Sequence, residues 1–283
     1  MAEARVGISG WRYAGWRGVY YPKGLRQADE LAYAADRMTS IELNGSFYAL
    51  QRPASWHRWR DGTPDRFVFS VKAPRIVTHV KRLRDIDAPL ANFFASGVLD
   101  LGAKLGPILW QLPPTLAFDP ELLGGFLTRL PRSRADAAAL ASRHDERMSG
   151  RASFAVATDA PLRHAVEVRH PSFEEFADDW VALLERHGAA SVTADTAGRY
   201  PRLDRTTADF AYARLHGEEE LYASGYDDDS LDRWAAWARA HLDAGRDAYL
   251  YFDNDIKVRA PYDAMALIAR LPRPSGVPEV DVG

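Results

Sequence analysis

Eight short apolar runs, each closing on a polar or charged residue, constrain the fold of this chain most strongly. Most of them are followed by a stretch with helical periodicity. The residues that close the runs are Ser9, Glu42, Lys72, Gln111, Glu167, Asp195, His216 and Asp253. This alternation predicts an α/β protein, a single (β/α)8 TIM-like barrel. In that fold the polar side chains at the carboxyl ends of the strands line the functional face.

Length and composition fit one large domain. The chain has 283 residues, 47% of them hydrophobic, and barrels of this class run to about 250 residues. We expect the barrel at 1–271, interrupted by an insert at about 131–163 that carries a helix and a mobile link. A loose tail is expected at 272–283.

Helix signals fall between the strand runs. Ser172 and Glu175 form a capping-box pattern at the start of a helix that Gly188 ends. Further helices are expected over 231–242 and, closing the chain, over 263–271.

Composition excludes several kinds of chemistry. There is no cysteine, and so no disulfide, thiolate metal ligand or cysteine nucleophile. The amino-terminal segment lacks an apolar stretch long enough for a signal peptide or a membrane span, so we expect a cytoplasmic protein without a membrane partner. The formal net charge of −3 argues against a generally basic surface that coats nucleic acid, but not against a local basic groove.

One ionisable group closes each of the last four runs. We expect these groups to converge on one cavity, where they would act as acid-base groups or hold one divalent metal. The candidate catalytic residues are Glu42, Glu167, Asp195 and His216. His216 is expected to shuttle a proton near neutral pH.

An ionic network is the alternative interpretation of the same residues. In it, the carboxylates pair with Arg169, Arg214 and Lys72 and make the barrel mouth rigid without a metal. Sequence spacing leaves both interpretations open, because no compact metal-ligand motif is present.

A basic segment at 72–84 continues the third run. Together with residues after the fifth run, it could form an arc that binds a phosphate or a phosphodiester, because Arg offers forked donors and Lys a mobile charge. The residues of this arc are Lys72, Arg75, His79, Lys81, Arg169 and His170. A solvated surface is the alternative for the exposed part of the segment.

Other polar and aromatic residues are candidates for ligand contacts. Asn44, beside Glu42, precedes Phe47 and Tyr48, which could form a stacking wall or simply follow a tight turn. The loop after the seventh run contains Tyr222 and Tyr226 and is typical of a lid, a ligand wall or a packed loop. The remaining ligand-binding candidates are Gln111, Arg214, Asp253 and Asn254.

Some enzyme classes are disfavoured by position. Common barrel glycosidases carry carboxylates after the fourth and seventh strands, where this chain has Gln111 and His216. No dinucleotide-binding fingerprint, phosphate-binding P-loop or nucleophile elbow occurs in a suitable context.

Motifs along nearly the whole chain carry a family resemblance. They begin at Gly7-Ile8-Ser9-Gly10-Trp11, Ile41-Glu42-Leu43-Asn44, Phe69-Ser70-Val71-Lys72, Leu109-Trp110-Gln111, Glu167-Val168-Arg169-His170, Ala194-Asp195-Thr196 and Tyr251-Phe252-Asp253-Asn254. Through them the chain resembles the YecE-like barrel family, domain of unknown function 72. The resemblance implies a TIM-like barrel and no settled activity. It also implies a distant likeness to xylose isomerase and endonuclease IV barrels, whose fuller set of metal ligands this chain lacks.

Three hypotheses follow. The leading one is an enzyme, hydrolase or isomerase-like, that binds a small anionic ligand, phosphorylated or sugar-derived, at the carboxyl face of the barrel. The second is a nucleic-acid-binding or repair-associated protein that contacts the phosphate backbone through the basic segment. The third is a non-catalytic scaffold with an ionic network at its mouth.

Overall fold

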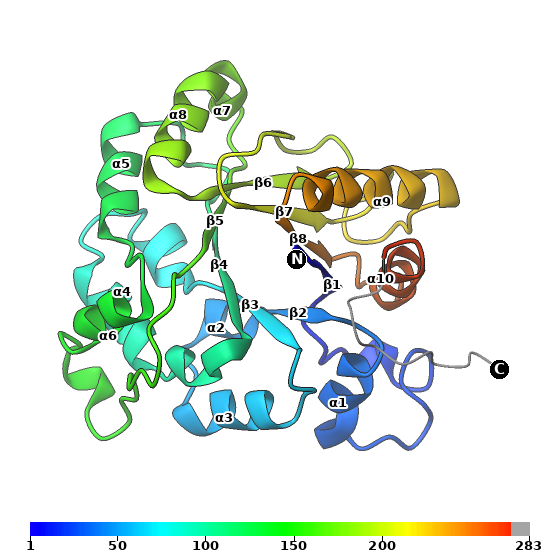
Figure 1. Ribbon diagram of the computed structural model, residues 1–283, viewed down its shortest axis with the longest axis horizontal. Helices are drawn as coiled ribbons and strands as arrows, with labels where there is room; N and C mark the ends of the chain where they lie inside the picture. The colour runs from blue at the N-terminus through cyan, green and yellow to red at the C-terminus, as the bar shows by residue number, and fades with distance from the viewer. Residues whose placement is uncertain (273–283) are drawn as a thin grey trace.

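The predicted barrel is confirmed. The computed structural model describes residues 1–272, and its eight parallel strands close into a ring in sequence order (Figure 1). The strands are β1 (Ala4–Ser9), β2 (Ser40–Leu43), β3 (Val68–Lys72), β4 (Leu105–Gln111), β5 (His164–Glu167), β6 (Ala190–Asp195), β7 (Phe210–Leu215) and β8 (Asp247–Phe252). All eight apolar runs are therefore strands.

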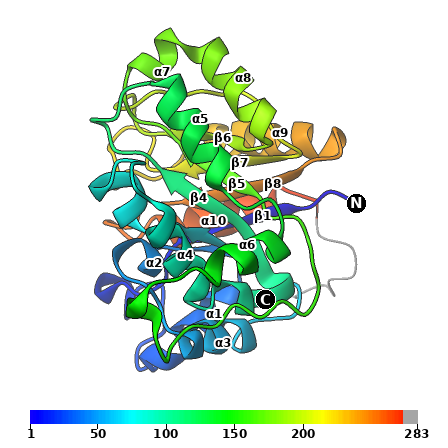
Figure 2. The same cartoon turned by 90° about the vertical axis from the view of Figure 1, so that its left-hand side faces the viewer.

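Helices surround this ring (Figures 1 and 2). They are α1 (Glu30–Ala35), α2 (Gly45–Tyr48), α3 (Pro53–Asp61), α4 (Asp87–Ala95), α5 (Pro120–Arg129), α6 (Arg134–Ala141), α7 (Ser172–Glu175), α8 (Ala177–His187), α9 (Asp228–Asp243) and α10 (Ala260–Ala269). Shorter 3-10 turns occupy Ala14–Trp16, Gln27–Asp29, Val98–Lys104 and Glu146–Met148, and a π-helical turn occupies Ile76–Val80.

Three expectations about helix boundaries were wrong. The helix expected over 231–242 begins three residues earlier, at Asp228. The helix expected from Ser172 is broken at Phe176 into α7 and α8, and Ser172 lies inside α7 instead of capping it. The Ser172 hydroxyl accepts the Phe118 N–H at 2.8 Å, so a tertiary contact uses the group that a capping box needs. The closing helix begins three residues earlier than expected, with Pro261 in its first turn.

The insert between β4 and β5 contains the expected helix, α6. Its amino end carries a capping box between Ser133 and Asp136. The segment packs against α4, where the Asp145 N–H donates to Asn92 at 3.0 Å and the Ser153 N–H donates to the Ala95 carbonyl at 2.8 Å. The expected loose tail lies, apart from Pro272, outside the described residues.

Side chains alternate along each strand between the inside of the barrel and the helix layer. Leu109, Val192, Ala194 and Tyr249 belong to the interior cluster. Nearer the carboxyl ends the interior becomes polar, and hydroxyls pair across the barrel, as Ser40 and Tyr251 do at 2.6 Å. The polar layer faces the end of the barrel at which β1–β8 finish, called the barrel mouth below.

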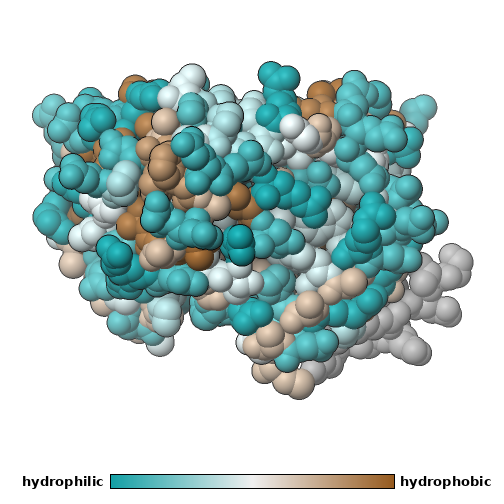
Figure 3. Space-filling view, turned by 90° about the horizontal axis from the view of Figure 1, so that it is seen from above, coloured by the Kyte–Doolittle hydropathy of each residue, from teal (hydrophilic) through white to brown (hydrophobic). Residues whose placement is uncertain are grey.

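The face of the molecule seen from above Figure 1 is mostly hydrophilic. Figure 3 shows its largest group of hydrophobic residues left of the centre and smaller groups elsewhere. No helix among residues 1–272 is both long and apolar enough to cross a membrane.

Replacing Asp119 by Ala is expected to lower the free energy of unfolding by about 1 kcal/mol, because α5 would lose its N-cap. Asp119 accepts the Leu122 N–H at 3.0 Å. Urea unfolding of Asp119→Ala and Asp119→Asn measures this effect. Asn can cap equally well, so a similar loss in both variants would contradict the assignment.

Candidate functional site at the barrel mouth

Arg214 is the centre of the polar layer. It stands at an interior position of β7 and is fully buried. Its guanidinium binds both Glu42 oxygens at 2.8 and 3.0 Å, Glu167 at 2.7 Å and Asp253 at 3.0 Å. Burial opposes its charge, but these three carboxylates raise its pKa well above the ordinary value. One cation therefore joins β2, β5, β7 and β8.

Hydroxyl groups complete the surroundings of Glu42. Ser9 donates to one of its oxygens at 2.8 Å and Tyr212 to the other at 2.7 Å. Tyr212 is also 2.6 Å from the Ser70 hydroxyl. Ser70 and Tyr212 were not among the predicted site residues, and Ser9 was predicted only as a polar residue that closes a strand.

Arg169 forms the next layer outward. Its Nε binds Glu167 at 2.7 Å, and its Nη atoms donate to neutral acceptors, Gln111 at 3.2 Å and the Tyr222 hydroxyl at 3.4 Å. Burial opposes ionisation of Glu167, yet Arg169 and Arg214 hold the pKa of that carboxyl far below its usual range. Arg169 retains 9% exposure, whereas Glu167 has none.

Tyr222 belongs to a constrained loop. Its backbone is in the left-handed region, with φ at 64°, a conformation that costs a non-glycine residue free energy. Its N–H donates to the His216 carbonyl, and its ring lies edge-on to the His216 ring at 5.3 Å. This loop therefore forms part of the wall of the barrel mouth.

Lys72 reaches the mouth without a partner. It ends β3 and is 9% exposed, and within the described chain its ammonium has no hydrogen bond or ion pair. Its Nζ lies 4.5 Å from the centre of the Phe47 ring. Burial and then the charge of Arg214 lower its pKa from the ordinary 10.5 to about 8.

His79 packs against the same aromatic ring. Its imidazole lies edge-on to Phe47 at 5.1 Å, and its Nδ1 is 2.8 Å from the Thr78 hydroxyl. Burial, followed by the charges of Lys72 and Arg169, lowers its pKa to about 4. His79 is therefore neutral at pH 7.

His216 lies between Arg214 and Asp253, and its surroundings do not favour the proton uptake near neutral pH that the sequence predicts. Its Nε2 is 3.3 Å from Arg214 Nη1 and its Nδ1 is 3.0 Å from Asp253 Oδ2. Because Arg214 can only donate, Nε2 is the acceptor and the proton is on Nδ1. Burial and then Arg214 lower its pKa, which keeps the ring neutral.

Asp195 does not join this cluster, contrary to the prediction. Ala194 belongs to the barrel interior, so Asp195, the next residue along β6, points to the helix layer. It lines a separate cavity of about 480 Å³ with residues of the loop before β7 and of α9. Burial raises the pKa of its carboxyl, against the nearby charge of Arg202 and a hydrogen bond from Tyr226.

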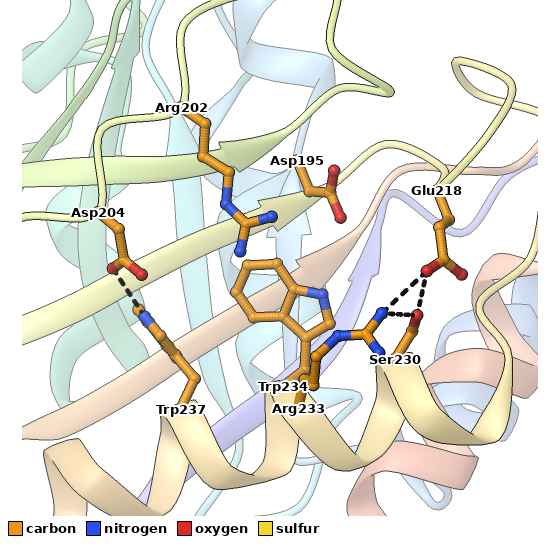
Figure 4. A pocket seen from close by; sticks show the side chains of 8 residues that line it. All are labelled: Asp195, Arg202, Asp204, Glu218, Ser230, Arg233, Trp234 and Trp237. Carbon is orange, nitrogen blue, oxygen red and sulfur yellow. Dashed lines mark hydrogen bonds and ion pairs between the residues drawn. The ribbon is translucent and has the colours of Figure 1, made fainter.

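Figure 4 shows this side cavity. Arg202 lies over the Trp234 ring, with its guanidinium carbon 5.0 Å from the ring centre. Arg233 is paired with Glu218 at 3.1 Å, and Trp237 donates to Asp204 at 2.9 Å. The cavity therefore has charges of both signs that largely satisfy one another.

The donor set does not fit the metal interpretation. Among residues 1–272, no three His, Asp or Glu side chains are placed to hold a metal ion. The guanidinium of Arg214 occupies the space between the carboxylates, which it binds directly. Arg169 and Arg214 pair with carboxylates, as the ionic-network interpretation predicts. Lys72 does not, because it pairs with no carboxylate among residues 1–272.

Three other candidates have internal partners. Tyr226 is buried and accepts the Gly217 N–H at 3.1 Å. Asn254 is fully buried and donates to the Ser224 carbonyl and to Asp263, both at 2.8 Å. His170 is bound to Ser172 at 2.9 Å at the start of α7.

The remaining candidates lie around the rim. Asn44 precedes α2, with its Oδ1 buried and unpaired in the described chain. Arg75 and Lys81 are exposed. Tyr48 is 73% exposed, so only Phe47 of the expected stacking wall contacts the cluster.

The fold and this site define a TIM-barrel protein with its polar cluster at the carboxyl ends of the strands. The chain belongs to the DUF72 family, described as a protein of unknown function, whose family model matches residues 5–280.

Relatives and solved structures agree with this assignment. The UPF0759 protein YecE of Escherichia coli O157:H7 is 28% identical over 68% of this chain and 58% of its own length. YunF of Bacillus subtilis is 32% identical over 38% of this chain and 39% of its own. The chain thus spans just over half, or less, of these relatives. A DUF72 family protein from Thermotoga maritima superposes with a TM-score of 0.73 at 25% identity, over 94% of this chain and 98% of its own. A DUF72 family protein from Enterococcus faecalis superposes with a TM-score of 0.73 at 14% sequence identity, over 95% of each chain.

Proposed function

We propose that the barrel mouth is an enzyme site for a small anionic ligand, phosphorylated or sugar-derived. The observation that carries this proposal is the separation of charges by depth. Glu42 and Glu167 are fully buried and held by arginine, whereas Lys72 and Arg169 retain exposure. A ligand that enters from solvent meets Lys72 and Arg169 beside Asp253, whose side chain is 15% exposed and already pairs with Arg214.

Arg169 and Lys72 are the anion-binding groups in this proposal. The two Nη atoms of Arg169 donate long hydrogen bonds to neutral acceptors. A carboxylate or phosphate would be a stronger acceptor. Arg75, exposed on the rim, adds positive charge near His79. Gln111 and Tyr222, which bind Arg169, hold its guanidinium in place.

Acid-base chemistry would fall to groups that are neutral at pH 7. In the tautomer that donates its Nδ1–H to the Thr78 hydroxyl, His79 has a free Nε2 without a hydrogen bond in the described chain, and the lowered pKa of the ring leaves this nitrogen unprotonated at pH 7. The buried carboxylates and His216 are positioning groups, because they hold Arg214 and Arg169. The reaction class, hydrolase or isomerase-like, is part of the same proposal.

Replacing Arg169 by Met is expected to weaken binding of a sugar phosphate by about 10- to 100-fold, the range for one lost charge-assisted contact. Titration calorimetry with ribose 5-phosphate, glyceraldehyde 3-phosphate and inorganic phosphate measures this. Arg26→Met is the matched control, since Arg26 is an exposed arginine paired with Asp29 at 2.7 Å. Equal affinity in Arg169→Met and wild type would contradict the proposal.

Nucleic-acid binding is the second candidate function. Short DNA is tested as a ligand in the same titration calorimetry. Lys72 is buried and Arg82 binds Thr115 at 2.7 and 2.8 Å, so fewer side chains of the basic segment are free than its sequence suggests. Affinity for DNA that falls steeply with salt would favour this candidate.

A further inference from the structure

We propose that the Lys72 amine is a nucleophile that forms an imine with the carbonyl group of a ligand bound at the barrel mouth. The ligand class is a small molecule that has both an anionic group and an aldehyde or ketone, such as the open-chain form of a sugar phosphate. This inference rests on the proposed anion site and adds a covalent step to it.

The surroundings of Lys72 are unlike those of a structural lysine. Lys104 is equally buried, at 8% exposure, but its ammonium donates to the Thr63 carbonyl at 2.7 Å, the Thr63 hydroxyl at 3.3 Å and the Arg60 carbonyl. Lys72, at 9% exposure, has no hydrogen-bond acceptor or ion-pair partner for its Nζ among residues 1–272, and this atom lies 4.5 Å from the centre of the Phe47 ring. A buried amine without acceptors is not held for stability.

Burial and the charge of Arg214 favour the neutral form of Lys72. Burial is the larger cause, and the two together outweigh Asp253, Glu42 and Glu167, which favour the charged form and are all paired with Arg214. With a pKa of about 8, about a tenth of the amine is neutral at pH 7, against less than a thousandth for an ordinary lysine. Desolvation beside another cation is one of the ways in which proteins activate an amine.

The proposed step is balanced without an oxidant or reductant. The Nζ lone pair forms a C–N bond to the carbonyl carbon, and the carbonyl oxygen takes a proton to give a carbinolamine. Nitrogen then gives up a proton, the C–O bond breaks, and the oxygen leaves as water, so amine and carbonyl yield imine and water. His79, which contacts the same Phe47 ring as Lys72, can accept and return the proton at Nε2 in the tautomer that donates its Nδ1–H to Thr78.

Arg169 and Arg75 remain to hold the anionic group while Lys72 binds the carbonyl carbon. Tyr222 reaches the same space through its contact with Arg169. The anion and the carbonyl thus have separate partners, which is what a bifunctional ligand requires.

Reductive trapping tests the inference directly. The chain has five lysines, Lys23, Lys72, Lys81, Lys104 and Lys257, so peptide mass spectrometry can assign every adduct. The full chain is incubated with ribose 5-phosphate, glyceraldehyde 3-phosphate or dihydroxyacetone phosphate and sodium cyanoborohydride. We expect one adduct, equal to the probe less one oxygen atom, at least 10-fold enriched at Lys72 over the exposed Lys23 and Lys257.

Two variants keep the test decisive. Lys72→Arg retains the charge but cannot form an imine, and it should lose the adduct while still binding inorganic phosphate. Lys104→Arg should be labelled like the wild type. Labelling that is even across the exposed lysines would overturn the inference.

Thermal shift with the same three probes separates the two proposals. Probes that raise the melting temperature but leave Lys72 unmodified would leave the anion site standing and remove the imine. Probes that neither raise the melting temperature nor label Lys72 would overturn both.

Discussion

Replacing Arg214 by Met is expected to lower the free energy of unfolding by about 5 kcal/mol or more, enough to unfold a marginally stable domain. The variant would leave three carboxylates, those of Glu42, Glu167 and Asp253, without the cation that all of them bind. The first two are fully buried and would have to take up protons or draw in water. Urea unfolding followed by circular dichroism measures the loss.

The controls separate charge from packing. Arg26→Met removes an exposed arginine and its partner contact, and we expect no measurable change in stability. Combining Arg214→Met with Glu42→Gln and Glu167→Gln removes the buried negative charges and should recover part of the lost stability. A loss below about 1 kcal/mol in Arg214→Met would show that the network does not hold the barrel mouth together.

Strand periodicity explains why the fold could be predicted. Each strand is short, apolar and closed by a polar residue, and the parallel ring brings these residues to one end. The same periodicity predicts which of them face inward. Glu42, Lys72, Glu167 and Asp253 are in step with the interior positions of their strands, and Asp195 is one residue out of step. The prediction that Asp195 joins the cluster was wrong because it used only the position of Asp195 at a strand end. It did not consider that successive side chains of a strand point to opposite faces.

Partners across the barrel could not be predicted in this way. Tyr212 looks like a core aromatic residue in the sequence, but its hydroxyl binds Glu42, 170 positions earlier. The signal for its direction is local, since it lies two residues before Arg214 on β7. The partner of the Tyr212 hydroxyl cannot be predicted from nearby residues, because it depends on the diameter of the closed barrel and on the register of distant strands.

The lack of a counterion for Lys72 among residues 1–272 is likewise a property of the assembled barrel mouth. A lysine after a strand, with several carboxylates at neighbouring strand ends, suggests an ion pair. Arg214 binds those carboxylates first, with a planar guanidinium that matches them in pairs. The ammonium of Lys72 is left beside Phe47.

Replacing Lys72 by Met is therefore expected to stabilise the protein at pH 7, by up to about 3 kcal/mol. The value follows from a pKa lowered from 10.5 in the unfolded chain to about 8 in the folded one. Below pH 8 the lysine is charged in both states, so the folded protein bears the full cost of the buried charge. Between pH 8 and 10.5 the folded protein has lost the proton and the unfolded chain still holds it, so the cost falls away as pH rises.

Urea unfolding of the wild type and Lys72→Met at pH 7 and pH 10 measures this difference. The free energy of unfolding of Lys72→Met should exceed that of the wild type at pH 7, and the difference between the two proteins should be smaller at pH 10. Lys104→Met is the matched control and should destabilise the protein at both pH values, because it leaves the Thr63 and Arg60 carbonyls without their donor. A Lys72 that stabilises the fold would be structural. A Lys72 that destabilises the fold, beside carboxylates that Arg214 already pairs, is retained for what it binds, since proteins keep such strain where function requires it.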